Sequence, residues 1–94
     1  MARITVIGSF VMDNVAKMDC FPQAGQTVLG NSLELFPGGK GANQCVAAAR
    51  LGGDVEMVGM LGRDANGDTF RKILREEGIE SRYVFSCDKP TAVA

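Results

Sequence analysis

The sequence alternates short apolar runs with segments whose apolar residues recur at helical spacing. Residues 4–7 and 55–61 are apolar runs of the kind found in strands that are buried on both faces. Residues 42–49 and 70–74 place their apolar side chains on one helical face, and Gly52 and Gly78 end these two predicted helices. Strands that alternate with helices form a parallel sheet with helices packed on its faces. The sequence therefore predicts an α/β fold.

Other short segments interrupt this alternation. Residues 28–29 and 33–35 read as two short strands joined by a turn at Gly30-Asn31, and we expect them to form a flap outside the main sheet. Residues 83–85 and 91–94 are predicted to be two further short strands. Because the sequence stops within the last of these strands, we expect the chain to be a fragment of a larger domain.

Composition excludes several classes of function. The chain has 94 residues, 46% hydrophobic and 22% charged, as in one small globular domain. Its net charge of −1 gives no broad attraction to nucleic acid or to an anionic membrane, and no apolar run approaches the ~20 residues that span a bilayer. The first residues alternate like a strand and do not resemble a signal peptide, so the cytoplasm is the expected location. Cys20, Cys45 and Cys87 lack metal-ligand spacing, and we interpret them as reduced and mostly structural.

The segment richest in chemistry lies just before the first predicted helix. Here Pro37-Gly38-Gly39 is expected to break the strand pattern, and Lys40-Gly41-Ala42-Asn43 follows. Glycines let the backbone approach a ligand closely, and the free amides at a helix start donate to oxygen atoms. Lys40 adds a cation, and Asn43 adds both a donor and an acceptor. These groups suit a polyhydroxylated ligand, and the alternative is a glycine-rich hinge that binds nothing.

Two common nucleotide-binding motifs are excluded for this segment. A Walker A loop needs glycine five residues before its Gly-Lys pair and Ser or Thr after it, whereas Glu34 and Gly41 stand at those places. A dinucleotide fingerprint needs Gly-x-Gly-x-x-Gly directly after the first strand. Here Gln44 holds the last position, and the segment lies about thirty residues after that strand.

Three aspartates are further candidates. Asp13 follows the first predicted strand, at the edge where open α/β sheets bind ligands, and an aspartate there can accept from two sugar hydroxyls. The alternative for Asp13 is a solvated loop carboxylate or a turn cap. Asp64 and Asp68 raise the question of a metal, but we prefer to interpret them as helix-start residues, favoured there by capping and by the helix dipole.

From Gly38 to Asn43 the sequence resembles the ribokinase, or pfkB, family of carbohydrate kinases. The spacing from Asn43 to Gly52 and then to Gly62 agrees with the first signature of that family. The resemblance extends in order over essentially the whole chain, and its motifs are specific as a set although each is weak alone. The other segments that resemble ribokinases are Gly8-Ser9 with Asp13, Phe21-Pro22, Gly25-Gln26-Thr27-Val28, Ala47-Ala48-Ala49-Arg50-Leu51-Gly52 and Gly62-Arg63-Asp64.

The resemblance implies that residues 1–94 are the amino-terminal part of a Rossmann-like domain, with helices on both faces of the sheet and a small β-sheet lid at about 14–36. It implies that Gly38 and Gly39 are hinge glycines, that Gly39, Lys40 and Asn43 contact a small sugar, and that Asp13 accepts the sugar's hydroxyls. It also implies homodimerisation through the lid strands. ATP and Mg²⁺ are the implied cofactors, with sites expected downstream of residue 94, and a monovalent cation is a further candidate.

The sequence departs from the family pattern at two positions. Ribokinases usually carry asparagine two residues before the aspartate, where this chain has Val11, so the identity of the sugar is left open. Cys45 stands where the family prefers a smaller residue such as alanine, and we interpret this as a packing change.

The catalytic motifs of the family do not occur in this sequence. A Gly-Ala-Gly-Asp motif with the catalytic base, anion hole and ATP loop, and an Asn-x-x-Glu motif linked to magnesium, lie later in members that are roughly three times as long. We therefore expect this chain to supply sugar contacts and a lid, but no catalytic residue, to a kinase that phosphorylates a sugar hydroxymethyl group. The alternatives are a non-catalytic sugar- or nucleoside-binding module and an inert truncation product.

Overall fold

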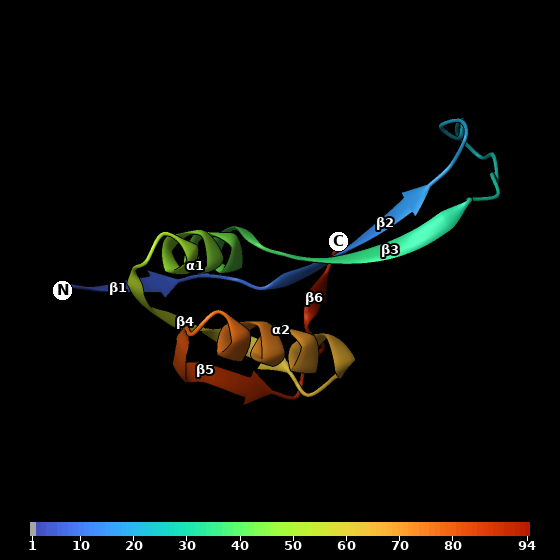
Figure 1. The fold of residues 1–94 in the computed structure, drawn as a ribbon. Helices are drawn as coiled ribbons and strands as arrows, with labels where there is room; N and C mark the ends of the chain where they lie inside the picture. The colour runs from blue at the N-terminus through green and yellow to red at the C-terminus, as the bar shows by residue number, and fades with distance from the viewer. Residues whose placement is uncertain (1) are drawn as a thin grey trace.

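The computed structural model describes residues 2–94, which form two three-stranded sheets and two helices (Figure 1). The elements are β1 (Arg3–Ile7), β2 (Val11–Lys17), β3 (Ser32–Gly38), α1 (Lys40–Arg50), β4 (Asp54–Gly62), α2 (Ala65–Glu76), β5 (Glu80–Cys87) and β6 (Ala92–Val93). One sheet is parallel throughout, in the order β1-β4-β5, and the other has the order β3-β2-β6. The predicted α/β fold with a parallel sheet is confirmed. No helix within residues 2–94 is long and apolar enough to cross a bilayer.

The hydrophobic core lies between the parallel sheet and the two helices, which pack side by side on one face of it. The rings of Phe10 and Phe70 lie 5.0 Å apart between centroids. Cys45 is completely buried, with its Sγ 3.1 Å from Met57 Sδ, and burial raises the pKa of its thiol. Cys45 is thus a packing residue, as predicted. The core consists of Phe10, Met12, Ala42, Cys45, Val55, Met57, Leu61, Phe70, Leu74, Ile79 and Val84.

The opposite face of the parallel sheet carries no helix among residues 2–94. Ile7 is 80% exposed there, Met60 60% and Phe85 53%. The prediction that residues 4–7 are buried on both faces is therefore wrong for the described part of the chain, because both helices pack on the other face. The second helical layer that the family resemblance implies has no counterpart within these residues.

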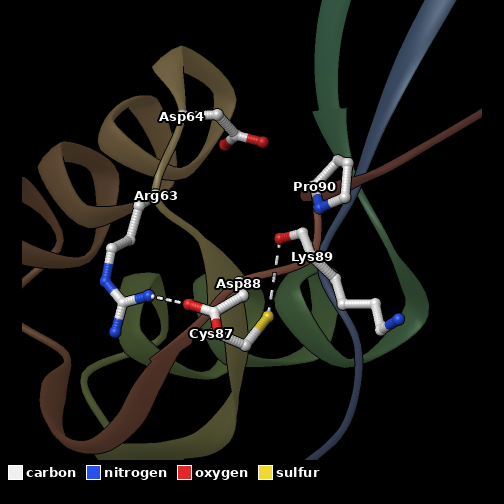
Figure 2. Close-up of a pocket in the computed structure, with 6 residues that line it drawn as sticks. All are labelled: Arg63, Asp64, Cys87, Asp88, Lys89 and Pro90. Atoms are coloured by element: carbon white, nitrogen blue, oxygen red, sulfur yellow. Dashed lines mark hydrogen bonds and ion pairs between the residues drawn. The ribbon is translucent and has the colours of Figure 1, made fainter.

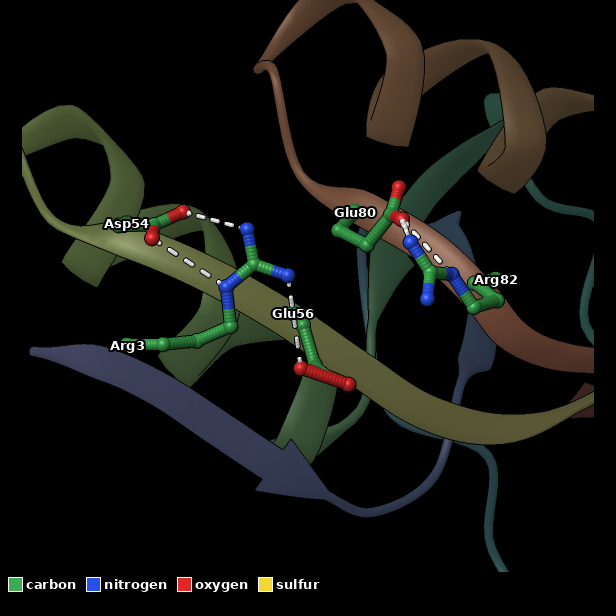
Figure 3. A network of polar contacts seen from close by, with 5 residues as sticks. All are labelled: Arg3, Asp54, Glu56, Glu80 and Arg82. Atoms are coloured by element: carbon green, nitrogen blue, oxygen red, sulfur yellow. Dashed lines mark hydrogen bonds and ion pairs between the residues drawn. The ribbon is translucent and has the colours of Figure 1, made fainter.

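Charged side chains occupy the amino-terminal ends of the parallel strands (Figure 3). Arg3 donates to both carboxylate oxygens of Asp54, at 3.2 and 3.0 Å, and lies 3.6 Å from Glu56. The hydrogen bond and the charge of Asp54 raise the pKa of Arg3. Glu80 and Arg82 form a separate pair at 3.2 Å. Exposed pairs of this kind contribute little stability, so the parallel sheet depends mainly on the core behind it.

β2 and β3 form an antiparallel hairpin that extends away from the body, which we define as β1, β4, β5, α1 and α2 (Figure 1). The register runs from Val11 opposite Gly38 to Lys17 opposite Ser32. This extension gives a radius of gyration of 15.9 Å, compared with about 13 Å for a compact domain of 100 residues. The hairpin therefore lies largely outside the packed region.

Two predictions about the hairpin are wrong. Residues 28–29 do not form a strand, and the partner of residues 32–38 is β2. β3 also continues through Pro37, which was expected to end it. Proline is tolerated there because β3 is an edge strand, whose N–H groups can face solvent without loss of a ladder bond.

β6 joins the hairpin rather than the parallel sheet. It runs parallel to β2, with Ala92 beside Val11 and Val93 beside Met12. The amide of Asn14 donates to the carbonyl of Ala94 at 2.6 Å, and the amide of Ala94 donates to the carbonyl of Met12 at 3.0 Å. The inner half of β2 consequently lies between two strands, whereas its outer half has only β3 as a neighbour.

Candidate functional site

The carboxylate of Asp13 lies over the backbone of Gly38. The two residues are on neighbouring strands, and a Cβ built on Gly38 would lie 2.7 Å from Asp13 Oδ2. Any side chain at position 38 would displace the carboxylate, so this close approach requires glycine. Asp13 is half-buried and makes no ion pair within residues 2–94. The structure thus brings two of the predicted site residues together.

Gly39 connects the hairpin to α1 and has a conformation that favours glycine. Its φ of 98° lies in the left-handed region, and a Cβ there would be 2.6 Å from the carbonyl oxygen of Ser9 and 2.9 Å from the amide nitrogen of Val11. Both the backbone angle and the lack of space exclude other residues. Gly39 therefore holds the start of α1 close to the segment that leads into β2.

The start of α1 also packs against the end of β1. A Cβ built on Gly41 would lie 2.7 Å from the Cα of Gly8. The sequence analysis named Gly8 only in a segment that resembles ribokinases, and its contact with Gly41 was not predicted. Gly8 and Gly41 are far apart in the sequence, so their contact cannot be predicted from local sequence patterns.

Two backbone amides at the start of α1 have no partner among the described residues. The amide of Ala42 donates to Ser9 at 3.2 Å and that of Asn43 donates to Gly39 at 2.9 Å, but the amides of Lys40 and Gly41 make no such bond. No side chain caps the helix, and its first turn contains no acidic residue. Free amides and the positive end of the helix dipole together attract an oxygen-bearing ligand.

Lys40 and Asn43 are exposed on the first turn of α1. Lys40 makes no ion pair among residues 2–94 and so is not paired with Asp13. Asn43 lines a groove of about 790 Å³ between α1 and α2, together with Pro37 and Ile73, and Asp13 does not line this groove. The structure therefore places Asp13 against Gly38, and it places Asn43 on a groove that Asp13 does not line.

A second depression, of about 390 Å³, lies at the carboxyl ends of β4 and β5 (Figure 2). Arg63 and Asp88 neutralise each other across it at 2.7 Å, and Cys87 Sγ lies 3.5 Å from the carbonyl oxygen of Lys89. The paired charges leave little net charge for a ligand. The depression is lined by Arg63, Asp64, Cys87, Asp88, Lys89 and Pro90.

Asp64 caps α2, as predicted from the sequence. Its Oδ1 accepts from the amide of Gly67 at 2.8 Å. The same carboxylate also accepts from the amide of Thr91 at 2.8 Å and from the Thr91 hydroxyl at 2.7 Å, which was not predicted. The bonds from Thr91, with that from Gly67, hold the pKa of Asp64 below its usual range. Asp68 lies in the first turn of α2, where the helix dipole favours it.

Two further patterns bear on ATP and Mg²⁺. Within residues 2–94, no three histidine, cysteine or acidic side chains gather as a set of metal ligands. The turn before α1 offers two amides and one lysine, whereas a P-loop surrounds its phosphates with amides and adds a hydroxyl for the metal. The turn is therefore not a P-loop.

Known proteins of one family share this arrangement. Residues 1–94 match the pfkB family of carbohydrate kinases. Ribokinase of Bacillus subtilis is 51% identical over 84 residues, which cover 89% of this chain and 29% of the relative. The crystal structure of ribokinase from Thermotoga maritima has a TM-score of 0.91 at 34% identity, covering 100% of this chain and 31% of its own. Arabidopsis thaliana ribokinase, solved with ribose and ATP, has a TM-score of 0.85 at 33% identity. The match covers 99% of this chain and 31% of the Arabidopsis chain.

The chain thus spans 29–31% of the length of these relatives. Because the family match includes every described residue, it covers the parallel sheet, the hairpin and the turn at Gly38 and Gly39, which we call the glycine turn. The chain belongs to the pfkB family of carbohydrate kinases.

Proposed function

We propose that this chain is the amino-terminal, sugar-binding and lid portion of an ATP-dependent carbohydrate kinase that phosphorylates a hydroxymethyl group of a small sugar. The observation that carries the proposal is the Asp13 carboxylate held against Gly38, at the turn that leads to the unpartnered amides of α1. A carboxylate accepts hydrogen bonds from hydroxyls, and amides and lysine donate to them. The two sides of the turn are therefore complementary to a polyol.

In this proposal Asp13 accepts from two sugar hydroxyls, while Lys40 and the backbone at Gly39 donate to sugar oxygens. Asn43 supplies one further donor and acceptor. Hydrogen bonds that involve a charged group are stronger than neutral ones, which gives Asp13 and Lys40 the largest expected contributions. Neither side chain is engaged in an ion pair within residues 2–94, so sugar binding does not have to break one.

The hairpin segment at about 14–36 acts as the lid, with Gly38 and Gly39 as its hinge. Asp13 directly precedes this segment, so closure would bring the lid over a sugar bound at Asp13, Lys40 and Asn43. The extension of the hairpin from the body supports this role. Closure over a bound sugar would exclude water and orient the acceptor hydroxyl.

The remainder of the proposal concerns the whole protein. Val11, where ribokinases usually carry asparagine, leaves the choice of sugar open. ATP and Mg²⁺, with a monovalent cation as a further ion, are expected to bind residues beyond this segment, and the protein is expected to work in the cytoplasm. Homodimerisation through the hairpins is supported by exposed apolar side chains on β3, since Leu33 is 68% exposed, Leu35 54% and Phe36 46%.

The test uses the full-length protein that carries this segment. A panel of pentoses, hexoses and nucleosides is offered with ATP, and the best substrate is then used to compare wild type with Asp13→Asn. Loss of a charged hydrogen-bond partner is expected to raise the KM for sugar by about 10- to 100-fold and leave the KM for ATP unchanged. Asp19→Asn is the matched control, because Asp19 binds Asn31 beyond the end of β2.

Two outcomes would contradict the proposal. One is that no member of the panel is phosphorylated, and sugar binding without turnover would then favour a non-catalytic module. The other is that Asp13→Asn uses the sugar as well as Asp19→Asn does, which would remove Asp13 from the site.

A further inference from the structure

Asp64 and Thr91 form a partly buried junction between the body and the strand that carries Asp13. Thr91 is 5% exposed and is the one buried polar side chain among residues 2–94. Its hydroxyl donates to Asp64 at 2.7 Å and accepts from the amide of Gly62 at 3.0 Å, while its own amide donates to Asp64 at 2.8 Å. Thr91, directly before β6, is thus hydrogen-bonded both to the end of β4 and to the residue that caps α2. Figure 2 shows the Asp64 carboxylate pointing from its turn toward the segment that contains Pro90.

The backbones at this junction approach one another closely. A Cβ built on Gly62 would overlap the carbonyl oxygen of Lys89 and would lie 2.6 Å from the amide nitrogen of Thr91. A Cβ on Gly67 would overlap the carbonyl oxygen of Gly62. Glycine at both positions allows this contact, because a side chain at either one would push the neighbouring backbone away. The arrangement of the junction therefore depends on these two glycines.

The position of β2 depends on this arrangement. Thr91 directly precedes β6, and Ala92 and Val93 pair with Val11 and Met12. Bonds between Asn14 and Ala94 and between Ala94 and Met12 extend the pairing past Asp13 on both sides. The backbone that carries Asp13 is thus hydrogen-bonded to a strand that is itself held by Asp64.

We propose that Asp64 and Thr91 are positioning residues for the sugar site: they fix the base of the hairpin so that the Asp13 carboxylate meets its ligand in the correct place. The inference rests on the proposed sugar site but adds two residues that do not contact the sugar. Misplacement of a binding group by a fraction of an ångström weakens binding without removing any contact group. We therefore expect a substitution at the junction to change the KM for sugar and to leave the KM for ATP unchanged.

The test compares Thr91→Val with Thr91→Ser in the full-length protein. Valine keeps the shape but removes the hydroxyl, whereas serine keeps the hydroxyl. Thr91→Val is expected to raise the KM for sugar about tenfold while the KM for ATP stays constant. Thr91→Ser, which keeps the hydroxyl, is expected to have a KM for sugar close to that of wild type. Thr69→Val is the matched control, because the Thr69 hydroxyl bonds only within α2, to Ala65 at 3.1 Å.

Amide hydrogen exchange provides a readout that does not depend on activity. Thr91→Val is expected to speed exchange at residues 11–14 and 92–94 and at Gly62, whose amide loses its acceptor. The amides of β1, of residues 54–61 and of α1 are expected to stay unchanged. Equal exchange in wild type and variant would overturn the inference, as would faster exchange spread over the whole body, which would indicate general destabilisation. A protein that phosphorylates no sugar would refute the proposed function, and the exchange pattern would still decide whether the junction holds β2.

Discussion

The body and the hairpin are built on different physical principles. In the body, the side chains between sheet and helices are almost fully buried, with Met57 at 0% and Phe70 at 2% exposure. In the outer hairpin, Leu33 and Leu35 remain more than half exposed, and an ion pair between Lys17 and Glu34 at 3.1 Å spans the two strands. The body is held by packing, whereas the hairpin is held by its backbone ladder. The outer hairpin is therefore the part that can move without loss of the core, whereas Met12 at the base of β2 belongs to that core.

The glycine turn lies where these two regions meet. Asp13 is part of β2 and so of the hairpin. The inner half of β2, where Asp13 lies, is flanked by both β3 and β6. Lys40 and Asn43 belong to α1 and hence to the body. A ligand bound by both sets of residues would couple the two regions, which is how a lid responds to its substrate.

The largest expected effect is on the core. Phe70→Ala removes a ring that is 2% exposed and packs against Phe10, and it should lower the free energy of unfolding by about 3–5 kcal/mol. Leu33→Ala, at a side chain that is 68% exposed, should change it by less than about 0.5 kcal/mol. Urea denaturation of the two full-length variants measures both values. Similar losses would show that the hairpin is packed as firmly as the body.

The proposed hinge can be tested separately from the rest of the hairpin. Gly39→Val combines a positive φ with overlap against Ser9 and Val11, so it should reduce kcat/KM for the sugar by about 100-fold. Gly25→Val is the control, because Gly25 also has a positive φ but would place its Cβ in open space. Steady-state kinetics with sugar and with ATP measure the difference. Normal turnover in Gly39→Val would contradict a hinge at this position.

Acid should weaken the junction. Hydrogen bonds from Thr91 and Gly67 lower the pKa of Asp64 in the folded state, below its unfolded value of about 3.9. The ionised carboxylate therefore stabilises the folded protein above about pH 4, and this contribution is lost as the pH falls through the lowered folded-state pKa. Asp64→Asn should flatten the decline of stability below about pH 4, measured by urea denaturation across that range. Asp68→Asn is the control and should decline as wild type does. An equally steep decline of stability in Asp64→Asn would contradict the prediction.

The smallest effect concerns the ion pair on the hairpin. Lys17→Met removes the partner of Glu34, and both side chains are largely exposed, at 61% and 44%. The free energy of unfolding should fall by less than about 1 kcal/mol, and added salt should reduce even this difference. Denaturation at low and high salt checks both points. A larger loss that persists in salt would mean that the hairpin depends on this pair.

Local sequence patterns predicted the body better than the hairpin. The apolar spacing in 42–49 and 70–74, with glycines at 52 and 78, located both helices closely, because helix periodicity and helix ends are local properties. The partner of β3 was wrong because strand pairing depends on distant residues. For the same reason the sequence did not indicate that β6 would join the hairpin or that Asp64 would bind Thr91.

The candidate site was predictable in part. Asp13 and the glycine turn could be selected from residue chemistry and family resemblance, and the structure places Asp13 against Gly38. The close backbone approaches at Gly8 and Gly62 could not be predicted, because the need for glycine there depends on backbone atoms that are distant in the sequence.

Sugar binding by the full-length protein, measured calorimetrically for wild type and Asp13→Asn, tests most directly whether a carboxylate beside the glycine turn recognises a polyol. The expected result is that the variant loses the heat of sugar binding while it still binds ATP. Undiminished sugar affinity in Asp13→Asn would show that the ligand, if any, is held elsewhere.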